Sequence, residues 1–193
     1  MREILVFFEI PLKSFIFVKN HTLKIVLLGY MGSGKSTVGK YLATRMNLQF
    51  LDLDDYIEKS EGNSIPAIFE SRGELYFRKK EFQYLEEICS EKDNFILSTG
   101  GGTPCYGLNL ETIVMATENV FYLKVSIPEL VNRLSKEKSK RPLIKSIPVE
   151  DLPEFIGKHL FERNQYYNQA NHTIVCDTKE TDKIAAEIEM LSV

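Results

Sequence analysis

The octapeptide GYMGSGKS, residues 29–36, constrains this 193-residue chain more than any other feature. It fits the pattern G-x-x-x-x-G-K-[ST], in which glycines let the backbone curl until several N–H groups point at one phosphate. A short β-branched run, LKIVLLG, precedes it, and the helical pattern of GKSTVGKYLATRMN follows it. Because this strand-then-helix context is the one that the pattern requires, the segment predicts a phosphate-binding loop.

Two side chains of this loop indicate the kind of phosphate. Lys35 is placed to reach the β- and γ-phosphates of a nucleoside triphosphate, and the Ser36 hydroxyl is placed to bind Mg²⁺. A GTPase switch would usually carry D-x-x-G and N-K-x-D as well, and neither occurs in the sequence. A small-molecule kinase needs other parts instead, an acceptor pocket and a lid that excludes water.

The order of elements predicts an α/β fold. Apolar runs indicate strands in five segments: 23–29, 48–54, 94–102, 120–125 and 172–177. Helical patterns cover 34–47, 73–89, 126–136, 154–170 and 180–191, and Ser64 with Pro66 is typical of a further helix start. This alternation predicts a mostly parallel sheet with helices on both faces and ligands at the carboxyl ends of its strands.

Gross composition excludes several classes of protein. The net charge of -3 argues against a nucleic-acid partner, and no apolar stretch reaches the length of a membrane span. The cysteines at 89, 105 and 176 are far apart, which predicts free thiols in a reducing cytosol. Residues 1–22 are apolar only in pieces, and we expect a poorly ordered extension without assigned function rather than an extra strand or an anchor.

Two arginines fall on apolar helix faces. In the helix after Gly73, the spacing predicts one inner stripe that also contains Arg78; its apolar members are Leu75, Phe82, Leu85 and Cys89. In the late helix Arg163 falls among Ile156, Leu160 and Tyr167. A structural salt bridge or an amphipathic stem explains each arginine alone equally well. Together, in a chain with a phosphate loop, they suggest a clamp on an anion, and a planar guanidinium suits a carboxylate.

Two loops complete the predicted ligand edge. STGGGT, residues 98–103, ends a strand, and three successive glycines suggest that the backbone itself approaches a ligand closely. KSKRPL holds Arg141 in a charged segment without apolar periodicity. A solvated basic run is the ordinary interpretation of such a segment, and the alternative is a lid arginine that closes onto the triphosphate.

The acidic stretch FLDLDD, residues 50–55, divides by strand alternation. Asp52 and Asp54 are predicted on one face of a strand, at the end nearest the phosphates. We expect Asp52 to face Mg²⁺ through water, because that ion keeps several waters. Asp55 points the other way and is interpreted as a carboxylate at a helix start.

The motifs together resemble one family. GYMGSGKST, DLD, SIPAIFESRGELYFRKKE, STGGGT, RPLI and ERNQYY occur in the order and at spacings suitable for shikimate kinases, over residues 23–193. The resemblance implies phosphorylation of the 3-hydroxyl of shikimate by ATP with one Mg²⁺, toward chorismate and the aromatic amino acids. It also implies a cytoplasmic monomer with a three-layer P-loop fold around a five-stranded parallel sheet. A shikimate-binding helical region would span about 54–90 and a mobile lid about 136–151.

The resemblance also implies roles for individual residues. The ATP phosphates would be bound by Gly32, Ser33, Gly34, Lys35, Ser36 and Thr37. Ser36 would ligate Mg²⁺ directly, Arg133 would lie against the adenine, and Arg141 would close onto ATP. Shikimate would be held by Asp54, Arg78, Arg163 and the backbone at Gly101, with Glu81 orienting Arg78. The catalytic residues would be Lys35, Asp54 and Arg141, and Asp54 would act either as a general base or as a positioning group.

Two other classes of function remain open on the sequence alone. One is a related P-loop kinase for another small acceptor, such as gluconate or a nucleotide. The other is a nucleotide-binding regulator without catalysis, although the presence of Lys35, Ser36 and Asp54 argues against it.

Overall fold

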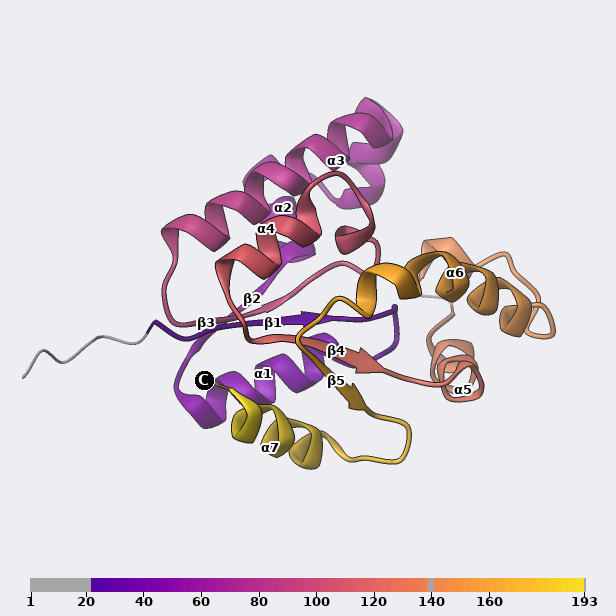
Figure 1. Cartoon of the computed structure of the whole chain (residues 1–193). Coiled ribbons are helices and arrows are strands. Elements are labelled where there is room, and N and C mark those ends of the chain that lie inside the picture. The colour runs from indigo at the N-terminus through magenta and orange to yellow at the C-terminus, as the bar shows by residue number, and fades with distance from the viewer. Residues whose placement is uncertain (1–21, 139–140, 193) are drawn as a thin grey trace, which may run out of the picture.

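The structure is a computed structural model and describes residues 22–138 and 141–192, so nearly all of the predicted N-terminal extension lies outside the described residues (Figure 1). The strands are β1 (Lys24–Leu28), β2 (Gln49–Asp52), β3 (Phe95–Ser98), β4 (Val120–Lys124) and β5 (His172–Val175). The helices are α1 (Lys35–Met46), α2 (Leu53–Glu61), α3 (Ile65–Glu91), α4 (Asn109–Ala116), α5 (Ile127–Glu137), α6 (Leu152–Tyr167) and α7 (Thr181–Leu191), with short 3₁₀ turns η1 (Thr103–Cys105) and η3 (Pro142–Ile144).

The strands form one five-stranded sheet in the order β2-β3-β1-β4-β5, and every pair is parallel. From β1 the chain first builds β2 and β3, which lie toward one edge of the sheet. It then crosses β1 to build β4 and β5, which lie toward the other edge. The strand order therefore reverses at β1, which opens a crevice beyond the carboxyl ends of the central strands. The predicted five-stranded parallel sheet is confirmed.

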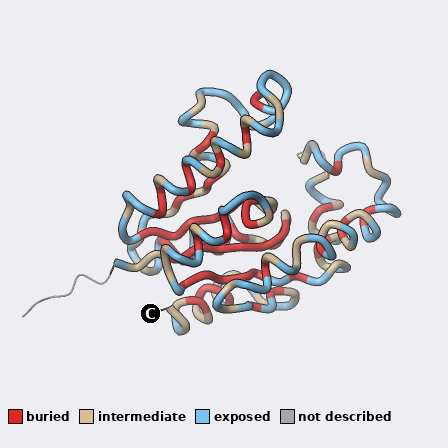
Figure 2. The backbone as a smooth tube through the Cα atoms, turned by 45° about the horizontal axis from the view of Figure 1, so that its top comes forward, coloured by how far each residue is buried: buried red, intermediate tan, exposed pale blue. Residues whose placement is uncertain are grey.

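Helices cover both faces of the sheet. In Figure 1, α1 and α7 lie below it and α3 and α4 above it, while α5 and α6 lie beyond the carboxyl ends of the strands. Most strand residues are buried, and the strands run through the interior in Figure 2. This explains why they show as continuous apolar runs, since parallel strands are covered on both faces.

The helical region between β2 and β3 has clear local causes. Ser64 caps α3 by accepting the Ala67 N–H, and Pro66 occupies the first turn, as predicted. At Gly73 the backbone has φ 79° and ψ 172°, so α3 consists of two helical segments joined by a kink. Glycine suits this position because a side chain would disfavour the positive φ.

The apolar stripe predicted for α3 is confirmed at Leu85 and Cys89 and wrong at Leu75. Leu75 is 87% exposed, whereas the buried face of the helix is formed by Phe77, Glu81, Tyr84, Leu85, Ile88 and Cys89. The face that meets α2 and α4 decides which side is buried, and spacing alone could not fix it. Helix α4 was not predicted at all. The inner face of α6 is confirmed, because Ile156, Leu160 and Tyr167 are buried.

The acidic stretch also departs from its prediction. Strand β2 ends at Asp52, and Asp54 belongs to α2, so the two carboxylates do not alternate along a strand. Asp52 instead caps α2 by accepting the Asp54 N–H at 3.2 Å. Asp55 is exposed in the first turn of α2, as predicted.

The structure bears on the cysteines and on membrane-spanning helices, within the residues that it describes. Cys89, Cys105 and Cys176 are free thiols. In residues 22–138 and 141–192, every helix is too short or too polar to cross a membrane.

Candidate active site

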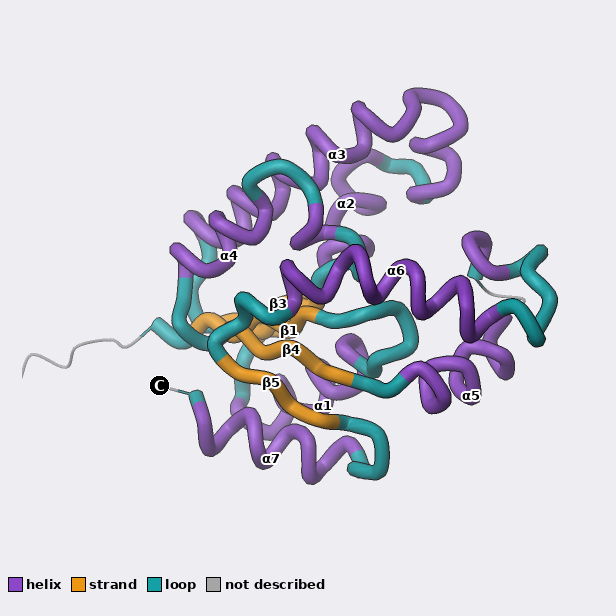
Figure 3. The backbone as a smooth tube through the Cα atoms, turned by 45° about the vertical axis from the view of Figure 1, so that its right-hand side comes forward, coloured by secondary structure: helices purple, strands orange, loops and turns teal. Residues whose placement is uncertain are grey.

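A cavity of about 550 Å³ lies at the carboxyl ends of the central strands. It is bounded by the loop before α1, the end of β2, the loop after β3, α5 and the start of α7. Figure 3 brings this edge of the sheet forward and shows the loops that leave the strands there. Its wall includes Lys35, Ser36, Asp52, Asp54, Ser98, Gly101, Arg133 and Arg141. Residues predicted from five separate stretches of sequence therefore meet in one space.

The phosphate loop closes around its own lysine. Gly34, with φ 95°, turns the chain into α1 and is the residue before the helix. Lys35 Nζ donates to the carbonyls of Gly29 at 2.8 Å and Tyr30 at 3.1 Å. Burial lowers the pKa of Lys35 to about 8, although the charges of Asp54 and Asp52 oppose that shift. The loop thus holds a poorly solvated cation beside a helix N-terminus, which favours an anion.

An oxygen-lined corner lies next to this lysine. Ser36 Oγ donates to Asp52 Oδ2 at 2.7 Å and lies 3.3 Å from Ser98 Oγ. In the described residues no group of three or more His, Cys, Asp or Glu side chains could hold a metal ion. A few hard oxygen atoms, completed by water and phosphate, are the donor set that Mg²⁺ prefers, so these residues fit that ion. Ser98 was not singled out from the sequence; its strand partner Asp52 brings it here.

Asp54 is a carboxylate in a poorly solvated position. Burial raises the pKa of Asp54 to about 6, with the charges of Asp52 and Glu81 adding to the rise and Lys35 opposing it. A half-buried carboxylate whose pKa lies close to neutrality, on the wall of a cavity, is a candidate for acid–base chemistry.

Each glycine of the triple-glycine loop meets a different neighbour. A Cβ on Gly100 would come 3.0 Å from Asp54 Oδ1, and one on Gly101 would come 3.2 Å from the backbone N of Met31. A Cβ on Gly102 would lie 3.5 Å from the ring of Tyr106. The glycine backbone therefore lies close to Asp54 and to the phosphate loop at once, and its close approach to a ligand stays a prediction.

The two arginines on the lid side of the cavity have different surroundings. Arg133 donates to the carbonyls of Gly32, Ser33 and Cys176 at 3.2–3.4 Å and pairs with Glu129, so it braces the phosphate loop against the end of β5. Arg141 pairs with Glu137 at 2.9 Å in a half-buried position. Of these two arginines, Arg141 is the one held by a single partly exposed carboxylate and by no backbone carbonyl that the structure gives.

Arg78 is held by side chains rather than by backbone. Its guanidinium donates to Glu74 at 3.1 and 3.3 Å and to Glu81 at 3.2 Å. Glu81 is 1% exposed and also accepts the Thr103 hydroxyl at 2.7 Å and the Asn109 amide at 3.4 Å. The contact from Glu81 to Arg78, expected from the sequence, is present, and the same carboxylate ties α3 to the glycine loop.

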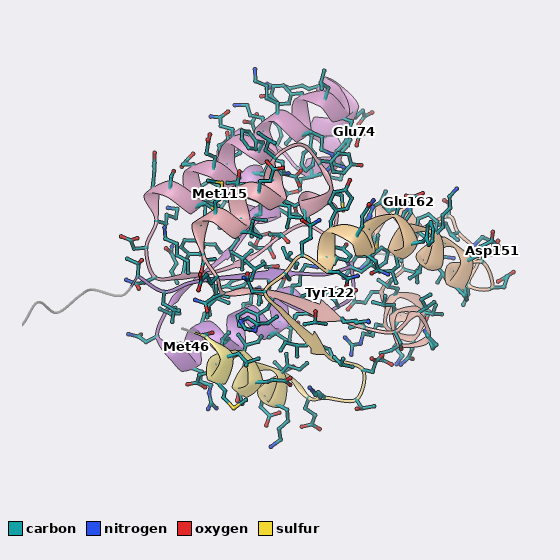
Figure 4. All side chains as sticks on the ribbon, viewed as in Figure 1. Met46, Glu74, Met115, Tyr122, Asp151 and Glu162 are labelled. Carbon is teal, nitrogen blue, oxygen red and sulfur yellow. The ribbon has the colours of Figure 1, made fainter. Side chains whose placement is uncertain are left out.

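Arg163 reaches the same loop from α6. Its Nη1 donates to the Gly101 carbonyl at 3.4 Å, and the Tyr167 hydroxyl donates to the same oxygen. The guanidinium also lies 5.6 Å from the ring centroid of Tyr30 in the phosphate loop. Arg78 and Arg163 therefore both approach residues 101–102, and neither is among the residues that line the cavity. Figure 4 marks the two elements by Glu74 on α3 and Glu162 on α6.

This chain is similar to known proteins of one family. The model of the shikimate kinase family matches residues 31–191. The shikimate kinase of Flavobacterium psychrophilum is 46% identical over 87% of this chain and 98% of its own length, and that of Flavobacterium johnsoniae is 47% identical over 86% and 96%.

The chain belongs to the shikimate kinase family.

Solved structures agree with this assignment. The shikimate kinase of Bacteroides thetaiotaomicron superposes with a TM-score of 0.80 at 34% identity, over 88% of this chain and 96% of that one. The shikimate kinase of Acinetobacter baumannii, in complex with shikimate, gives 0.79 at 33% identity over 89% and 93%. The predicted P-loop α/β fold, enzyme class and ATP-dependent phosphorylation of shikimate in aromatic biosynthesis are confirmed. The roles of individual site residues stay predictions.

Proposed function

We propose that this shikimate kinase transfers the γ-phosphoryl group of ATP directly to the 3-hydroxyl of shikimate, with the acceptor between Asp54 and the arginines Arg78 and Arg163. One observation carries this assignment. The half-buried carboxylate of Asp54 lies against Gly100 of the same glycine loop whose next two residues meet Arg163 and Arg78. A hydroxyl-binding group and two carboxylate-binding groups are thus placed around one loop, on the side of the cavity away from α7.

The phosphate loop would bind the phosphates through the residues from Gly32 to Thr37. Ser33 supports this, because its hydroxyl is buried and without a hydrogen-bond partner among the described residues. Lys35 would exchange the carbonyls of Gly29 and Tyr30 for β- and γ-phosphate oxygens. Because its ammonium is poorly solvated, little hydration is lost when it meets an anion there.

Ser36 and Asp52 would hold one Mg²⁺, the serine directly and the carboxylate through water. When bound, the ion supplies charge neutralisation on the phosphate oxygens. Asp52 orients the Ser36 hydroxyl through its hydrogen bond of 2.7 Å, and it keeps the start of α2 in place by capping it.

In the transfer step, the acceptor oxygen forms a bond to the γ-phosphorus while the bond from that phosphorus to the bridging oxygen breaks, and the electron pair leaves with ADP. The proton of the hydroxyl goes to Asp54 if that residue is the base. A pKa of about 6 leaves Asp54 mostly ionised at pH 7 and so able to accept it. Asp54→Asn keeps the shape but not the basicity, and near-normal kcat in that variant would leave only the positioning role.

Arg78, Arg163 and the backbone at Gly101 would hold the acceptor, the arginines through its carboxylate. Arg141 would turn from Glu137 onto the phosphates as the lid closes, and Arg133 would line the adenine side next to α7. Residues 23–193 would form the single kinase domain, acting as a cytoplasmic monomer without nucleic-acid or membrane partner. We assign no function to residues 1–22.

A coupled ADP-release assay tests the acceptor. We expect turnover with shikimate that depends on Mg²⁺, and turnover near the background ATPase rate with gluconate or nucleoside monophosphates. Equal turnover on gluconate, or tight ATP binding without turnover on any acceptor, would overturn the proposal.

A further inference from the structure

Tyr106 makes the closest cation–ring contact that the structure gives for the described residues. The central carbon of the Arg78 guanidinium lies 3.5 Å from the centroid of the Tyr106 ring. The ring of Phe77, the neighbour of Arg78 on α3, lies 5.1 Å from the same carbon. A distance of 3.5 Å means that the planar cation lies against the ring face, where dispersion and the ring quadrupole both favour it.

The loop that carries Tyr106 is built to hold the ring there. The Tyr106 N–H donates to the Thr103 carbonyl at 3.4 Å, and the Tyr106 carbonyl accepts the Asn109 N–H at 3.2 Å. Thr103 and Asn109 in turn donate to Glu81, which accepts from Arg78 as well. Tyr106 and Arg78 are therefore tied to the same buried carboxylate, one through the loop and the other directly.

Gly102 lies beside the contact. A Cβ at this position would lie 3.5 Å from the Tyr106 ring and 3.7 and 3.8 Å from the two terminal nitrogens of Arg78, which are ordinary van der Waals distances. The third glycine of the loop is therefore a neighbour of both the ring and the guanidinium.

Carboxylates and ring constrain Arg78 in complementary ways. Glu74 and Glu81 accept one N–H each from Nε, Nη1 and Nη2, so these bonds use three of the five N–H groups. One N–H on each terminal nitrogen is left for a carboxylate from outside. The carboxylates hold the guanidinium within its plane, and Tyr106 covers one of its faces and so fixes the tilt of that plane.

We propose that Tyr106 is a positioning residue for the acceptor site, which sets the affinity for the acceptor's carboxylate by fixing and partly dehydrating the Arg78 guanidinium. The inference rests on the proposed role of Arg78. A ring that is 38% exposed would otherwise be an ordinary surface side chain.

Steady-state kinetics on Tyr106→Ala and Tyr106→Phe test the proposal. In Tyr106→Ala we expect the KM for shikimate to rise about tenfold, the size of a partly desolvated cation–ring contact, with kcat and the KM for ATP changed less than about twofold. Tyr106→Phe keeps the ring face and should restore the KM to within about twofold. Tyr41→Ala, which removes a similarly exposed tyrosine from α1, is the matched control and should change none of these constants.

A neutral acceptor separates positioning from loss of structure. With the carboxamide of shikimate, kcat/KM of Tyr106→Ala should equal that of the unmutated enzyme, because there is no carboxylate for Arg78 to bind. In an Arg78→Met background, Tyr106→Ala should change the KM for shikimate less than about twofold. Equal losses on acid and amide, or a loss that persists without Arg78, would overturn the proposal. If Arg78→Met raises the KM and Tyr106→Ala does not, only the Tyr106 inference fails; if Arg78→Met has no effect, the acceptor assignment fails as well.

Discussion

The two cationic ends of the site are held in place by different kinds of group. At the phosphate end, Lys35 donates to two main-chain carbonyls and Arg133 to three. At the acceptor end, Arg78 is held by two carboxylates and an aromatic ring, which come from α3 and from the loop after η1. The phosphate end is thus built from backbone and the acceptor end mainly from side chains.

This difference in construction suggests that the phosphate end is a general binding element and the acceptor end a specific one. A backbone cradle at a helix N-terminus suits any phosphate chain, and its geometry depends on glycines. A guanidinium fixed by carboxylates and a ring offers a defined plane and a defined pair of donors, and that arrangement can distinguish one acceptor from another. We therefore expect substitutions at the first end to reduce turnover and substitutions at the second to reduce acceptor affinity.

The largest effect is expected for Lys35→Met. Removal of a preorganised donor at the transferred group should lower kcat about 10³-fold, because the cation acts mainly on charge that develops during transfer. The ADP-release assay with saturating shikimate measures it. Lys40→Met, which removes an exposed lysine from the same helix, should keep normal turnover. A kcat for Lys35→Met within tenfold of normal would contradict the assigned role.

Arg141→Ala should lower kcat about 10²-fold and change the KM for shikimate little, because this residue would act on the phosphates only when the lid closes. The same assay measures both constants. Lys145→Ala, an exposed lysine of the same segment, is the control. Unchanged kcat with shikimate bound would show that Arg141 has no part in the transfer.

Arg78→Lys probes the acceptor end. It retains the charge and loses the planar fork, so we expect the KM for shikimate to rise about 10- to 100-fold while the KM for ATP stays within about twofold. Arg45→Lys, at an exposed ion pair with Glu189, is a control for the same chemical change. A rise in the KM for ATP as large as that for shikimate would remove the distinction between the two ends.

The smallest expected effect is the change in stability of Asp54→Asn, which is measured separately from any change in its kcat. Burial raises the pKa of Asp54 from 3.8 to about 6, so the folded protein favours the protonated form, and stability falls as pH rises from about 4 to about 6 and stays lower above that. The variant should therefore be more stable than the unmutated protein by about 2 kcal/mol at pH 8, and the difference should vanish below about pH 4.

Urea unfolding at several pH values measures this difference. Asp55→Asn serves as the control, since Asp55 is exposed in the first turn of α2, where losing a carboxylate should cost about 0.5 kcal/mol at pH 8. A destabilised Asp54→Asn protein at pH 8 would show that the Asp54 carboxylate is compensated in the folded state.

The sequence by itself determined the phosphate end. Gly34, Lys35 and Ser36 act through the backbone that surrounds them, and a backbone conformation that depends on glycine leaves a local pattern in the sequence. The alternation of strands and helices likewise sufficed for a parallel sheet, because burial on both faces leaves continuous apolar runs. The helical spacing of apolar residues also placed Arg163 on the correct face of α6, because this helix has no kink and its period of about 3.6 residues is kept throughout.

Only the tertiary structure decided the acceptor end. The kink at Gly73 and the packing of α3 on α2 and α4 set which face is buried, so Leu75 was misplaced and Glu81 proved to be the carboxylate inside. Asp54 reached the cavity from a helix and not from a strand. Tyr106 contacts Arg78 from 28 residues away in sequence, through a loop anchored on Glu81. Such contacts between side chains of distant segments have no period and no local motif, and they exist only once the chain has folded.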